Sequence, residues 1–321
     1  MKVVIPGGSG QVGTLLARAF HRDGHEVVVL SRKPGSAPWR VVPWDARASG
    51  DWIAEFEGAD AVINLAGRSV NCRYNAENRR AIKQSRVEST SRVAEAISRT
   101  KHPPRVWLQM STATIYADRY DAANDEATGI LGGSEPGLPE TWRFSIDVVT
   151  SWERAVDDAV LPHTRKVKLR SAMVMSPDRG GIFDVVLGLV RHGLGGRAGH
   201  GRQFVSWIHG EDFVRAVYWL IERDLQGPVN LASPNPLPYA DFMRDLREAW
   251  GIRFGLPATK WMLEIGALIL RTETELVLKS RRVIPGRLMQ DGFTFLFPAW
   301  PEAARDLCHR WRKNLAGIPA R

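Results

Sequence analysis

Cysteine is scarce in this chain, and long apolar runs are absent. The 321 residues include two cysteines, Cys72 and Cys308, which lie far apart and outside any C-x-x-C pair. This excludes a disulfide framework and a thiolate metal site. The longest apolar run, Trp261–Leu270, is too short to span a bilayer and contains Glu264. Because the first residues also lack the charged-then-apolar pattern of a signal peptide, we expect a soluble, cytoplasmic protein without a membrane partner.

The spacings of metal centres and serine hydrolases are also missing. Among the eight histidines, only His21 and His25 stand four residues apart, and Asp23-Gly24 between them ends the helix that would have to carry both. No G-x-S-x-G nucleophile elbow occurs, since Gly8-Ser9-Gly10 is part of a different motif. We therefore expect neither a metal site nor Ser-His-Asp hydrolysis.

The net charge of +9 is the one compositional sign of a nucleic-acid partner. However, Lys and Arg are scattered along the chain, with only a mild surplus after Arg271. The clearest basic run with an aromatic residue, Arg310-Trp311-Arg312-Lys313, favours an amphipathic helix near the C-terminus over a patch that binds single strands. We expect no nucleic-acid binding, because the alternative requires an affinity that falls steeply with salt and rests on charge alone.

Short apolar segments alternate with helical patterns through the first half of the chain. In one helix, expected from Val12 to Phe20, apolar residues recur at helical spacing until Asp23-Gly24 ends the element. Nearly continuous apolar strands such as Val27–Leu30 are typical of a parallel sheet covered by helices on both faces. The pattern predicts an α/β fold with a doubly wound, Rossmann-type sheet. The expected strands are Lys2–Ile5, Glu26–Leu30, Arg40–Trp44, Ala61–Leu65, Arg105–Met110 and Val167–Arg170.

Glycines become frequent after Arg170, and this change in composition predicts that a second, smaller domain begins there. We expect residues 1–170 to form a dinucleotide-binding domain, joined by residues 203–232. Residues 171–202 and 233–321 then form a smaller C-terminal α+β domain for the substrate.

Two further elements bear on the ligand side of the sheet. The Gly- and Pro-rich segment Asn124–Pro139 is expected to be a loop on the side where ligands bind. It precedes a helix around Phe144–Asp158, and another helix is expected to begin near Glu211.

The strongest motif follows the first strand directly. The segment Gly7–Gly13 has the pattern G-x-x-G-x-x-G and leads straight into a helix. One glycine makes the tight turn, another admits the backbone to a pyrophosphate, and the last allows close packing of helix and strand. The helix N-terminus adds unpaired N–H groups and its positive dipole end. We expect a dinucleotide here rather than a turn without a ligand, with contacts from Gly7, Ser9, Gly10, Gln11, Val12 and Gly13.

The end of the second strand indicates which dinucleotide fits. An acidic residue there binds the ribose hydroxyls of NAD, whereas basic and hydroxyl side chains suit the 2′-phosphate of NADP. This position holds Ser31, Arg32 and Lys33, with no carboxylate. Because a guanidinium can bind phosphate through two hydrogen bonds, we predict NADP(H) as the cofactor. The alternative is an exposed basic turn without a ligand.

Further segments give the chain a resemblance to the extended short-chain dehydrogenase/reductases. These are Asn64-Leu65-Ala66-Gly67 after the fourth strand and Ser111-Thr112-Ala113-Thr114-Ile115-Tyr116 after the fifth. More narrowly, the chain resembles the branch called the epimerase family, which is related to nucleoside-diphosphate-sugar epimerases. The segments that carry this second resemblance are Ser85–Thr90, Gly201–Gln203, Trp207–His209 with Asp212, and Glu275–Val283.

The resemblance implies where a cofactor and a substrate bind. The residues implied at the adenine end are Ser31, Arg32 and Asp45, and those at the nicotinamide end are Leu65, Ala66, Gly67 and Thr112. A substrate domain is implied in the C-terminal portion, where the candidate substrate residues are Gln203, Trp207 and His209. A lone histidine is also common as a hydrogen-bonded structural residue, and a loop glutamine can be merely exposed. A homodimer through helices on the sheet flank is common in the group, although nothing in this sequence requires one.

Members of this group usually carry a Tyr-x-x-x-Lys pair on the helix after the fifth strand. In that pair the lysine lowers the pKa of the phenol, which then exchanges a proton with the substrate while hydride moves. Anchoring the helix on Trp152-Glu153 places Ser145 at the tyrosine position and Val149 at the lysine position. Serine is too weakly acidic without an activating base, and valine can neither tune a pKa nor hold a ribose.

Thr112 and Tyr116 are the leading catalytic candidates, and Tyr120, Asp118 and His209 are further ones. Thr112 would orient the reacting oxygen. The proton would come from Tyr116, another pocket residue or an ordered water, although the corresponding tyrosine in the resembling enzymes is usually structural. The sequence thus predicts an NADP(H)-binding oxidoreductase or epimerase-like protein that transfers hydride to or from a small polar metabolite. The alternative is a non-catalytic NADP(H)-binding sensor or scaffold, which the missing pair supports.

Overall fold

A seven-stranded sheet forms the centre of the protein. The computed structural model describes residues 1–33, 35–258 and 275–316, so that the apolar run Trp261–Leu270 lies outside the described residues. All neighbouring strands of the sheet are parallel, in the order β10-β6-β5-β4-β1-β2-β3. The strands are β1 (Lys2–Pro6), β2 (Glu26–Ser31), β3 (Arg40–Pro43), β4 (Ala61–Asn64), β5 (Val106–Thr112), β6 (Arg165–Ser171) and β10 (Gly227–Leu231). The predicted doubly wound α/β fold and its six strands are confirmed.

The alternating side chains of each central strand enter two different apolar layers. In β1, Val3 and Ile5 pack into one layer, whereas Val4 packs into the other. In β2, Val27 and Val28 divide between the same two layers. Since both faces of the strand are covered, nearly every position must be apolar, which explains why these strands read as continuous hydrophobic runs.

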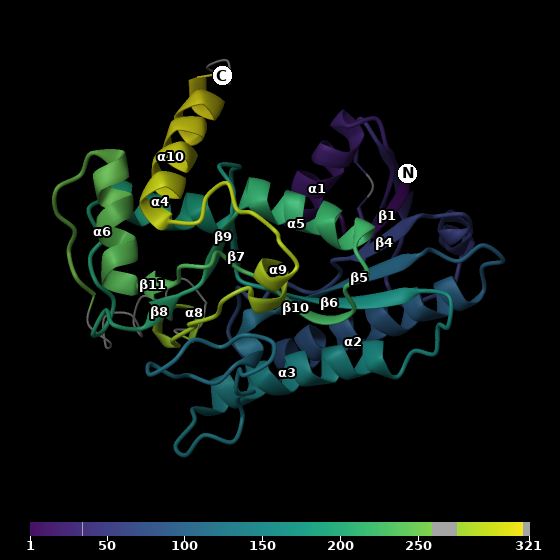
Figure 1. The fold of residues 1–321 in the computed structure, drawn as a ribbon, viewed down its shortest axis with the longest axis horizontal. Coiled ribbons are helices and arrows are strands. Elements are labelled where there is room, and N and C mark those ends of the chain that lie inside the picture. Colours follow the sequence, from purple (N-terminus) through teal and green to yellow (C-terminus); the bar gives the residue numbers. More distant parts are fainter. Residues whose placement is uncertain (34, 259–274, 317–321) are drawn as a thin grey trace.

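Helices cover both faces of the sheet (Figure 1). On one face lie α1 (Gln11–Arg22) and α5 (Gly210–Glu222), and on the other lie α2 (Ala76–Ser98) and α3 (Glu140–Asp157). The second face also receives the 3-10 helix η1 (Asp51–Phe56). Segment 203–232 therefore supplies both a helix and the edge strand β10 to this layered unit, while the division into two domains stays a prediction.

The C-terminal region has its own core, which is rich in tryptophan. Three helices surround that core: α4 (Ile182–Arg191), α6 (Tyr239–Trp250) and α10 (Trp300–Ala316). Trp207 and Trp300 meet edge to face inside it, with ring centroids 5.0 Å apart. The remaining elements are β7 (Met173–Met175) paired with β9 (Trp207–His209), β8 (Phe204–Val205) paired with β11 (Leu237–Pro238), η2 (Ala113–Ile115), α8 (Glu275–Leu278) and α9 (Gly286–Gln290).

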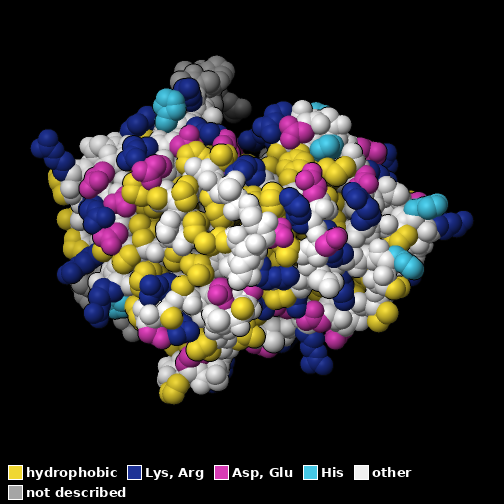
Figure 2. All heavy atoms as spheres, viewed as in Figure 1, with side chains coloured by type: hydrophobic (Ala, Val, Ile, Leu, Met, Phe, Trp, Pro, Cys, Tyr) yellow, Lys and Arg dark blue, Asp and Glu magenta, His cyan; other side chains and the backbone are white. Residues whose placement is uncertain are grey.

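The basic run Arg310–Lys313 belongs to an amphipathic helix, as predicted. Within it, Trp311 is buried and its indole N–H donates to Asp184 Oδ1 at 2.8 Å. Figure 2 shows that Lys and Arg side chains on this face of the molecule are interspersed with Asp and Glu. Among the described helices, none is both long enough and apolar enough to cross a bilayer.

Two basic side chains at the start of β6 cap the C-terminal ends of α5 and α3. Arg165 donates to the carbonyl oxygen of Leu220 in the last turn of α5 at 2.8 Å, and to that of Leu225 just beyond the helix at 2.6 Å. Lys166 donates to carbonyl oxygens at the end of α3, including that of Val156 at 2.8 Å. The carbonyls in the last turn of a helix lack the N–H donors of a following turn, and a cation there also opposes the negative end of the helix dipole. The amino edge of the sheet is therefore stabilised by charge.

We expect Arg165→Ala to lower the free energy of unfolding by about 1–3 kcal/mol, since partly buried carbonyls lose their charged donor. Urea denaturation followed by tryptophan fluorescence measures this change. The matched control is Arg305→Ala, which removes only an exposed pair with Glu302 and should change stability by less than about 0.5 kcal/mol. Equal stability of the two variants would contradict the capping role.

Candidate functional site

The phosphate loop joins β1 to α1 through direct contacts between backbones. Gly7 has φ +75°, and a Cβ there would lie 2.6 Å from the Cα of Ala66. A Cβ on Gly13 would lie 2.4 Å from the Cα of Gly8. These two positions therefore require glycine for packing, which holds whether or not a ligand binds.

Gly10 is different, because a Cβ there would meet no atom within 4 Å. It is the N-cap of α1 and gives the helix no side-chain cap, so the first N–H groups of the helix are open on this side. An open face at a helix N-terminus, walled by glycine backbone, fits a pyrophosphate group. The loop thus has the shape that a dinucleotide requires.

A second segment of the chain lies across this loop. A Cβ on Gly181 would come within 2.4 Å of Gln11 Nε2, and Asp178 forms a 3.1 Å ion pair with Arg18 of α1. The Gln11 Nε2 group is buried without a hydrogen-bond acceptor among the described residues. A donor left unsatisfied beside the open face indicates that an acceptor from a ligand belongs there. Gly181 could not be predicted from the sequence, because its place beside Gln11 depends on a tertiary contact.

The three residues predicted at the adenine end have different surroundings. Ser31 is buried, and its hydroxyl donates to Ser9 Oγ at 3.0 Å, which ties the end of β2 to the phosphate loop. Arg32 is exposed, and no hydrogen bond or ion pair holds it within the described ranges. The Asp45 carboxylate accepts from the N–H groups of Arg47 and Ala48, which hold its pKa below the usual range. Arg32 is therefore the side chain available to an incoming anion.

At the predicted nicotinamide end, backbone hydrogen bonds hold the loop after β4. The N–H of Leu65 donates to Pro6 O at 2.8 Å, and that of Ala66 donates to Asn64 Oδ1 at 3.1 Å. A Cβ on Gly67 would lie 3.2 Å from the guanidinium carbon of Arg86, so the arginine supports this turn.

Arg86 was identified only as part of a family-like segment, and the structure shows what it does. It donates to the carbonyl oxygens of Arg68 and Ile82 and lies over the ring of Trp152. Loss of water around the guanidinium lowers its pKa to about 10. The arginine therefore supports the turn at Gly67 through its bond to Arg68 O.

Thr112 ends β5, next to that turn. It is half-buried, and its hydroxyl donates to Thr114 Oγ1 at 3.2 Å while accepting from the Thr114 N–H at 3.3 Å. A hydroxyl at the carboxyl end of a central strand is well placed to contact a ligand in a doubly wound fold. Its role in orienting a substrate oxygen stays a prediction.

Tyr116 belongs to a buried polar network. Its hydroxyl donates to Asn230 Oδ1 at 2.9 Å and accepts from Arg170 at 3.0 Å, and Arg170 in turn pairs with Glu153 at 2.8 Å. Burial raises the pKa of the phenol, even though Arg170 opposes that effect. With both sides of its hydroxyl occupied, Tyr116 has the structural role that the sequence analysis left open, and the geometry gives no support to proton transfer from it.

The three candidate substrate residues also have structural surroundings. Gln203 and Trp207 are buried, and Gln203 Nε2 donates to the carbonyl oxygens of Ala198 and Val277. His209 is buried as the N-cap of α5: its Nδ1 accepts from the N–H of Glu211, which assigns the proton to Nε2, the atom 3.1 Å from Asp306. Burial lowers the pKa of His209. Their contact with a substrate stays a prediction that this degree of burial does not favour.

Ser145 and Val149, which stand at the tyrosine and lysine positions of the usual pair, have different surroundings. Val149 is buried against Ala113, Tyr116 and Val283, so the lysine position is part of the core. Ser145 instead donates a 2.6 Å hydrogen bond to Glu275 Oε2. This carboxylate comes from α8, 130 residues further along the chain.

The segment that follows α8 brings two more charged groups to the same place. Lys279 Nζ donates to Thr114 O at 2.8 Å, and Arg281 Nε donates to Thr114 Oγ1 at 3.2 Å. Burial, reinforced by repulsion from Arg281, lowers the pKa of Lys279 to about 8. In the sequence, this segment is recognisable only as part of the family resemblance. The signal for its role was the charged residues Glu275, Lys279 and Arg281 on either side of the apolar run Leu276-Val277-Leu278.

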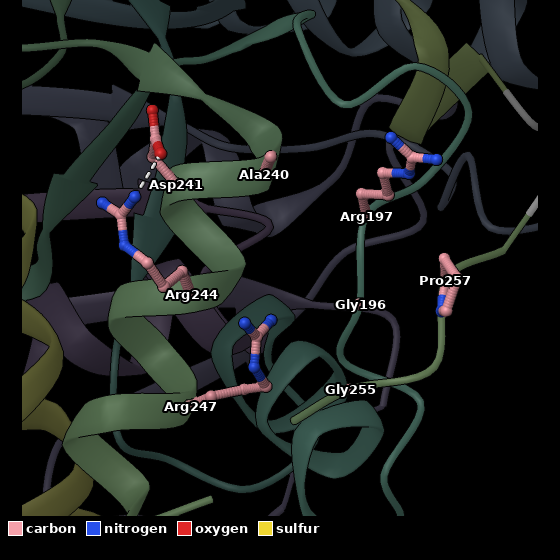
Figure 3. A pocket seen from close by; sticks show the side chains of 8 residues that line it. All are labelled: Gly196, Arg197, Ala240, Asp241, Arg244, Arg247, Gly255 and Pro257. Atoms are coloured by element: carbon pink, nitrogen blue, oxygen red, sulfur yellow. Dashed lines mark hydrogen bonds and ion pairs between the residues drawn. The ribbon is translucent and has the colours of Figure 1, made fainter. Parts of the chain in front are cut away.

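Another hollow, of about 410 Å³, lies beside α6, away from the phosphate loop (Figure 3). Three arginines line it, but Arg244 turns to Asp241 and Arg197 points away from Arg247. The guanidinium groups therefore do not converge on one point. No group of three or more potential metal ligands occurs within residues 1–33, 35–258 and 275–316.

The strand order, the glycine loop and the helices on both faces define a Rossmann-fold protein with a phosphate loop between β1 and α1. The family model described as "NAD dependent epimerase/dehydratase family" matches residues 3–135, and a "domain of unknown function (DUF1731)" matches residues 258–307. The chain belongs to this epimerase family, in the group of relatives named epimerase family protein.

Several relatives align over nearly the full length. Human "Epimerase family protein SDR39U1" is 31% identical and is aligned over 96% of this chain and 99% of its own. An epimerase family protein of Staphylococcus epidermidis is 26% identical, over 95% of this chain and 98% of its own. A crystal structure of human SDR39U1 with NADPH superimposes with a TM-score of 0.83 at 30% identity, covering 96% of this chain and 99% of that one.

The two kinds of loop glycine should respond differently to substitution. Gly13→Ala places a methyl group 2.4 Å from the Gly8 backbone, so we expect it to lower the free energy of unfolding by about 1–3 kcal/mol. Gly10→Ala adds a methyl group where no atom lies within 4 Å and should change stability by less than about 1 kcal/mol. Thermal unfolding measures both, and similar destabilisation of the two variants would contradict the open face at Gly10.

Proposed function

We propose that this protein binds NADP(H) and transfers hydride between its nicotinamide and a small polar metabolite. The observation that carries the proposal is the open, glycine-walled helix N-terminus at Gly10, with the unsatisfied Gln11 Nε2 beside it. Such a site binds phosphate through backbone N–H groups. The phosphate loop would hold the pyrophosphate, and a bound cofactor would supply the hydride chemistry.

The preference for the phosphorylated cofactor rests on the end of β2. Ser31 is committed to Ser9, whereas Arg32 is exposed and has no carboxylate partner within the described ranges. An NAD-type site would need an acidic group at this position to accept the ribose hydroxyls. The crystal structure of human SDR39U1 contains NADPH, which supports the same assignment for this chain.

The chain's own residues would position the two reactants. The turn at Gly67, supported by Arg86, and the hydroxyl of Thr112 would border the nicotinamide. Holding the reacting atoms close together accounts for much of the rate of such reactions. Whether the product is a carbonyl compound or an epimer depends on the metabolite, as does the direction of hydride transfer. A cytoplasmic location and a homodimer stay predictions.

A second candidate function is a cofactor-binding protein without catalysis. The burial of Val149 at the lysine position and the engagement of Tyr116 in a structural network favour it. Such a protein would bind the dinucleotide and present a cofactor-dependent surface to a partner. It would bind NADPH as tightly as an enzyme does, but it would not oxidise the bound NADPH in the presence of any carbonyl compound.

Calorimetric titration with NADPH and with NADH tests the cofactor assignment. We expect wild type to bind NADPH more tightly, and Arg32→Ala to weaken NADPH binding by about ten- to a hundredfold while NADH affinity changes little, because only the 2′-phosphate contact is lost. Gly10→Ala should weaken both, since its methyl group occupies the space for the pyrophosphate.

The control for these titrations is Arg305→Ala, an exposed arginine on α10. It should leave both affinities unchanged. If neither dinucleotide binds to wild type, the glycine loop is only a packing device and the proposed function is wrong. If NADPH binds and Arg32→Ala keeps the preference, the assignment of the 2′-phosphate contact is wrong but the binding site stands.

A further inference from the structure

We propose that Ser145 and Glu275 together form the proton relay of this site, in place of the missing Tyr-x-x-x-Lys pair. In this assignment Ser145 is the catalytic residue that contacts the substrate oxygen, and Glu275 is the positioning residue that takes up or returns its proton. The inference rests on the proposed hydride transfer. It adds the group that moves the proton, which the phosphate loop and Thr112 do not supply.

The geometry meets the requirement that serine alone could not. A serine hydroxyl becomes useful in acid–base chemistry when a base lies within hydrogen-bond distance. Ser145 Oγ donates to Glu275 Oε2 at 2.6 Å and also shares a hydrogen bond with Tyr74, which leaves one lone pair to accept a proton from a substrate hydroxyl. Ser145 is half-buried rather than buried, which leaves it reachable from the site.

Glu275 is held in place by a neighbouring arginine. It lies on the short helix α8, and Arg281 approaches its Oε1 at 3.9 Å. Arg281 also donates to Thr114 Oγ1, whose hydroxyl is bonded to Thr112. The same guanidinium therefore links Glu275 to the turn at the end of β5, so that both hydroxyl groups near the nicotinamide end belong to one connected set.

The segment that carries these groups is anchored at its far end. Ser206 Oγ donates to Arg281 O at 2.7 Å and accepts from the N–H of Val283 at 2.9 Å. Asn124 pairs with Val283, and its N–H donates to Arg282 O at 2.7 Å. These bonds fix the backbone that carries the charged side chains. Side chains on a fixed backbone can hold a proton-transfer group in one position.

The charged and titratable groups that face Glu275 come from three elements. Lys279 and Arg281 lie on its own segment, Ser145 lies on α3, and Tyr74 lies on the loop before α2. Burial and the neighbouring Glu275 carboxylate raise the pKa of Tyr74 to about 12. The phenol therefore stays protonated and is hydrogen-bonded to Ser145, so within this group the Glu275 carboxylate is the base.

In the oxidation direction, one hydride and one proton leave the substrate. The substrate carbon gives up hydride, with its electron pair, to the oxidised nicotinamide, and the substrate C–O bond becomes a carbonyl. The hydroxyl proton passes to Ser145 Oγ as the proton of Ser145 passes to Glu275 Oε2. The carboxyl then returns its proton to solvent. Reduction of a carbonyl runs through the same transfers in reverse and begins with a protonated carboxyl.

A thiol at position 145 tests the arrangement without any substrate. We would make Ser145→Cys in a Cys72→Ser background and follow alkylation by iodoacetamide with mass spectrometry. The remaining Cys308 is buried, which raises its thiol pKa to about 12 and keeps it unreactive. A neighbouring carboxylate disfavours the thiolate. Adding Glu275→Gln should therefore accelerate alkylation roughly three- to tenfold at pH 8, and saturating NADPH should protect position 145.

Ser98→Cys in the same background is the matched control, since Ser98 is exposed near the end of α2. Its alkylation should respond neither to Glu275→Gln nor to NADPH. If Glu275→Gln leaves the reactivity of the thiol at position 145 unchanged, the pairing is absent and the relay is overturned. If NADPH binds by calorimetry but does not protect, Ser145 is not at the nicotinamide end: the relay falls while the cofactor assignment stands.

Turnover tests the chemistry itself. On a panel of aromatic aldehydes, o-quinones and keto acids, Ser145→Ala should lower kcat for NADPH oxidation by about 10²–10⁴-fold, with NADPH affinity unchanged by calorimetry. In this direction kcat should fall as pH rises and the carboxyl loses its proton. This decrease of kcat with rising pH should be absent in Glu275→Gln. Glu275→Asp, which keeps a carboxylate, should have a higher kcat than Glu275→Gln. Equal rates for wild type and Ser145→Ala across the panel would overturn the assignment.

Discussion

The contact between backbones at the phosphate loop is the constraint on which the ligand side of this protein depends. Gly13 brings α1 against Gly8, and Gly7 brings the loop against Ala66. These approaches fix the direction of the first helix relative to β1 and β4. They also set where its N–H groups open, because a Cβ at either position would push helix or loop away. The neighbouring strand ends, with Ser31, Thr112 and the turn at Gly67, are arranged around this fixed point.

Much of the fold could be predicted because it depends on local patterns. Continuous apolar runs such as Val27–Leu30 identify strands covered on both faces, and Asp23-Gly24 marks the end of α1 correctly. The strand β10 contains Pro228 and Asn230 and is only five residues long, so periodicity alone does not identify it. Its place beside β6 follows from pairing across some sixty residues, which no short window of sequence records.

The site was predictable where backbone shape decides it and less so where side chains meet from distant segments. The glycine loop is one continuous motif, and its open face lies where the motif implies. By contrast, polar residues of the signature around Trp207 and His209 turned out to be built into the C-terminal core and the cap of α5. The carboxylate next to Ser145 comes from a segment 130 residues away. Spacing along the chain carries no information about such a contact.

The anchoring of the segment after α8 has a consequence for substitutions in a distant loop. Because Val283 pairs with Asn124, the loop that begins there and the chain that carries Glu275 are mechanically connected. The backbone that carries Glu275 is thus supported by a loop that lies far away in the sequence, so a substitution in that loop can alter the surroundings of the carboxylate without touching it.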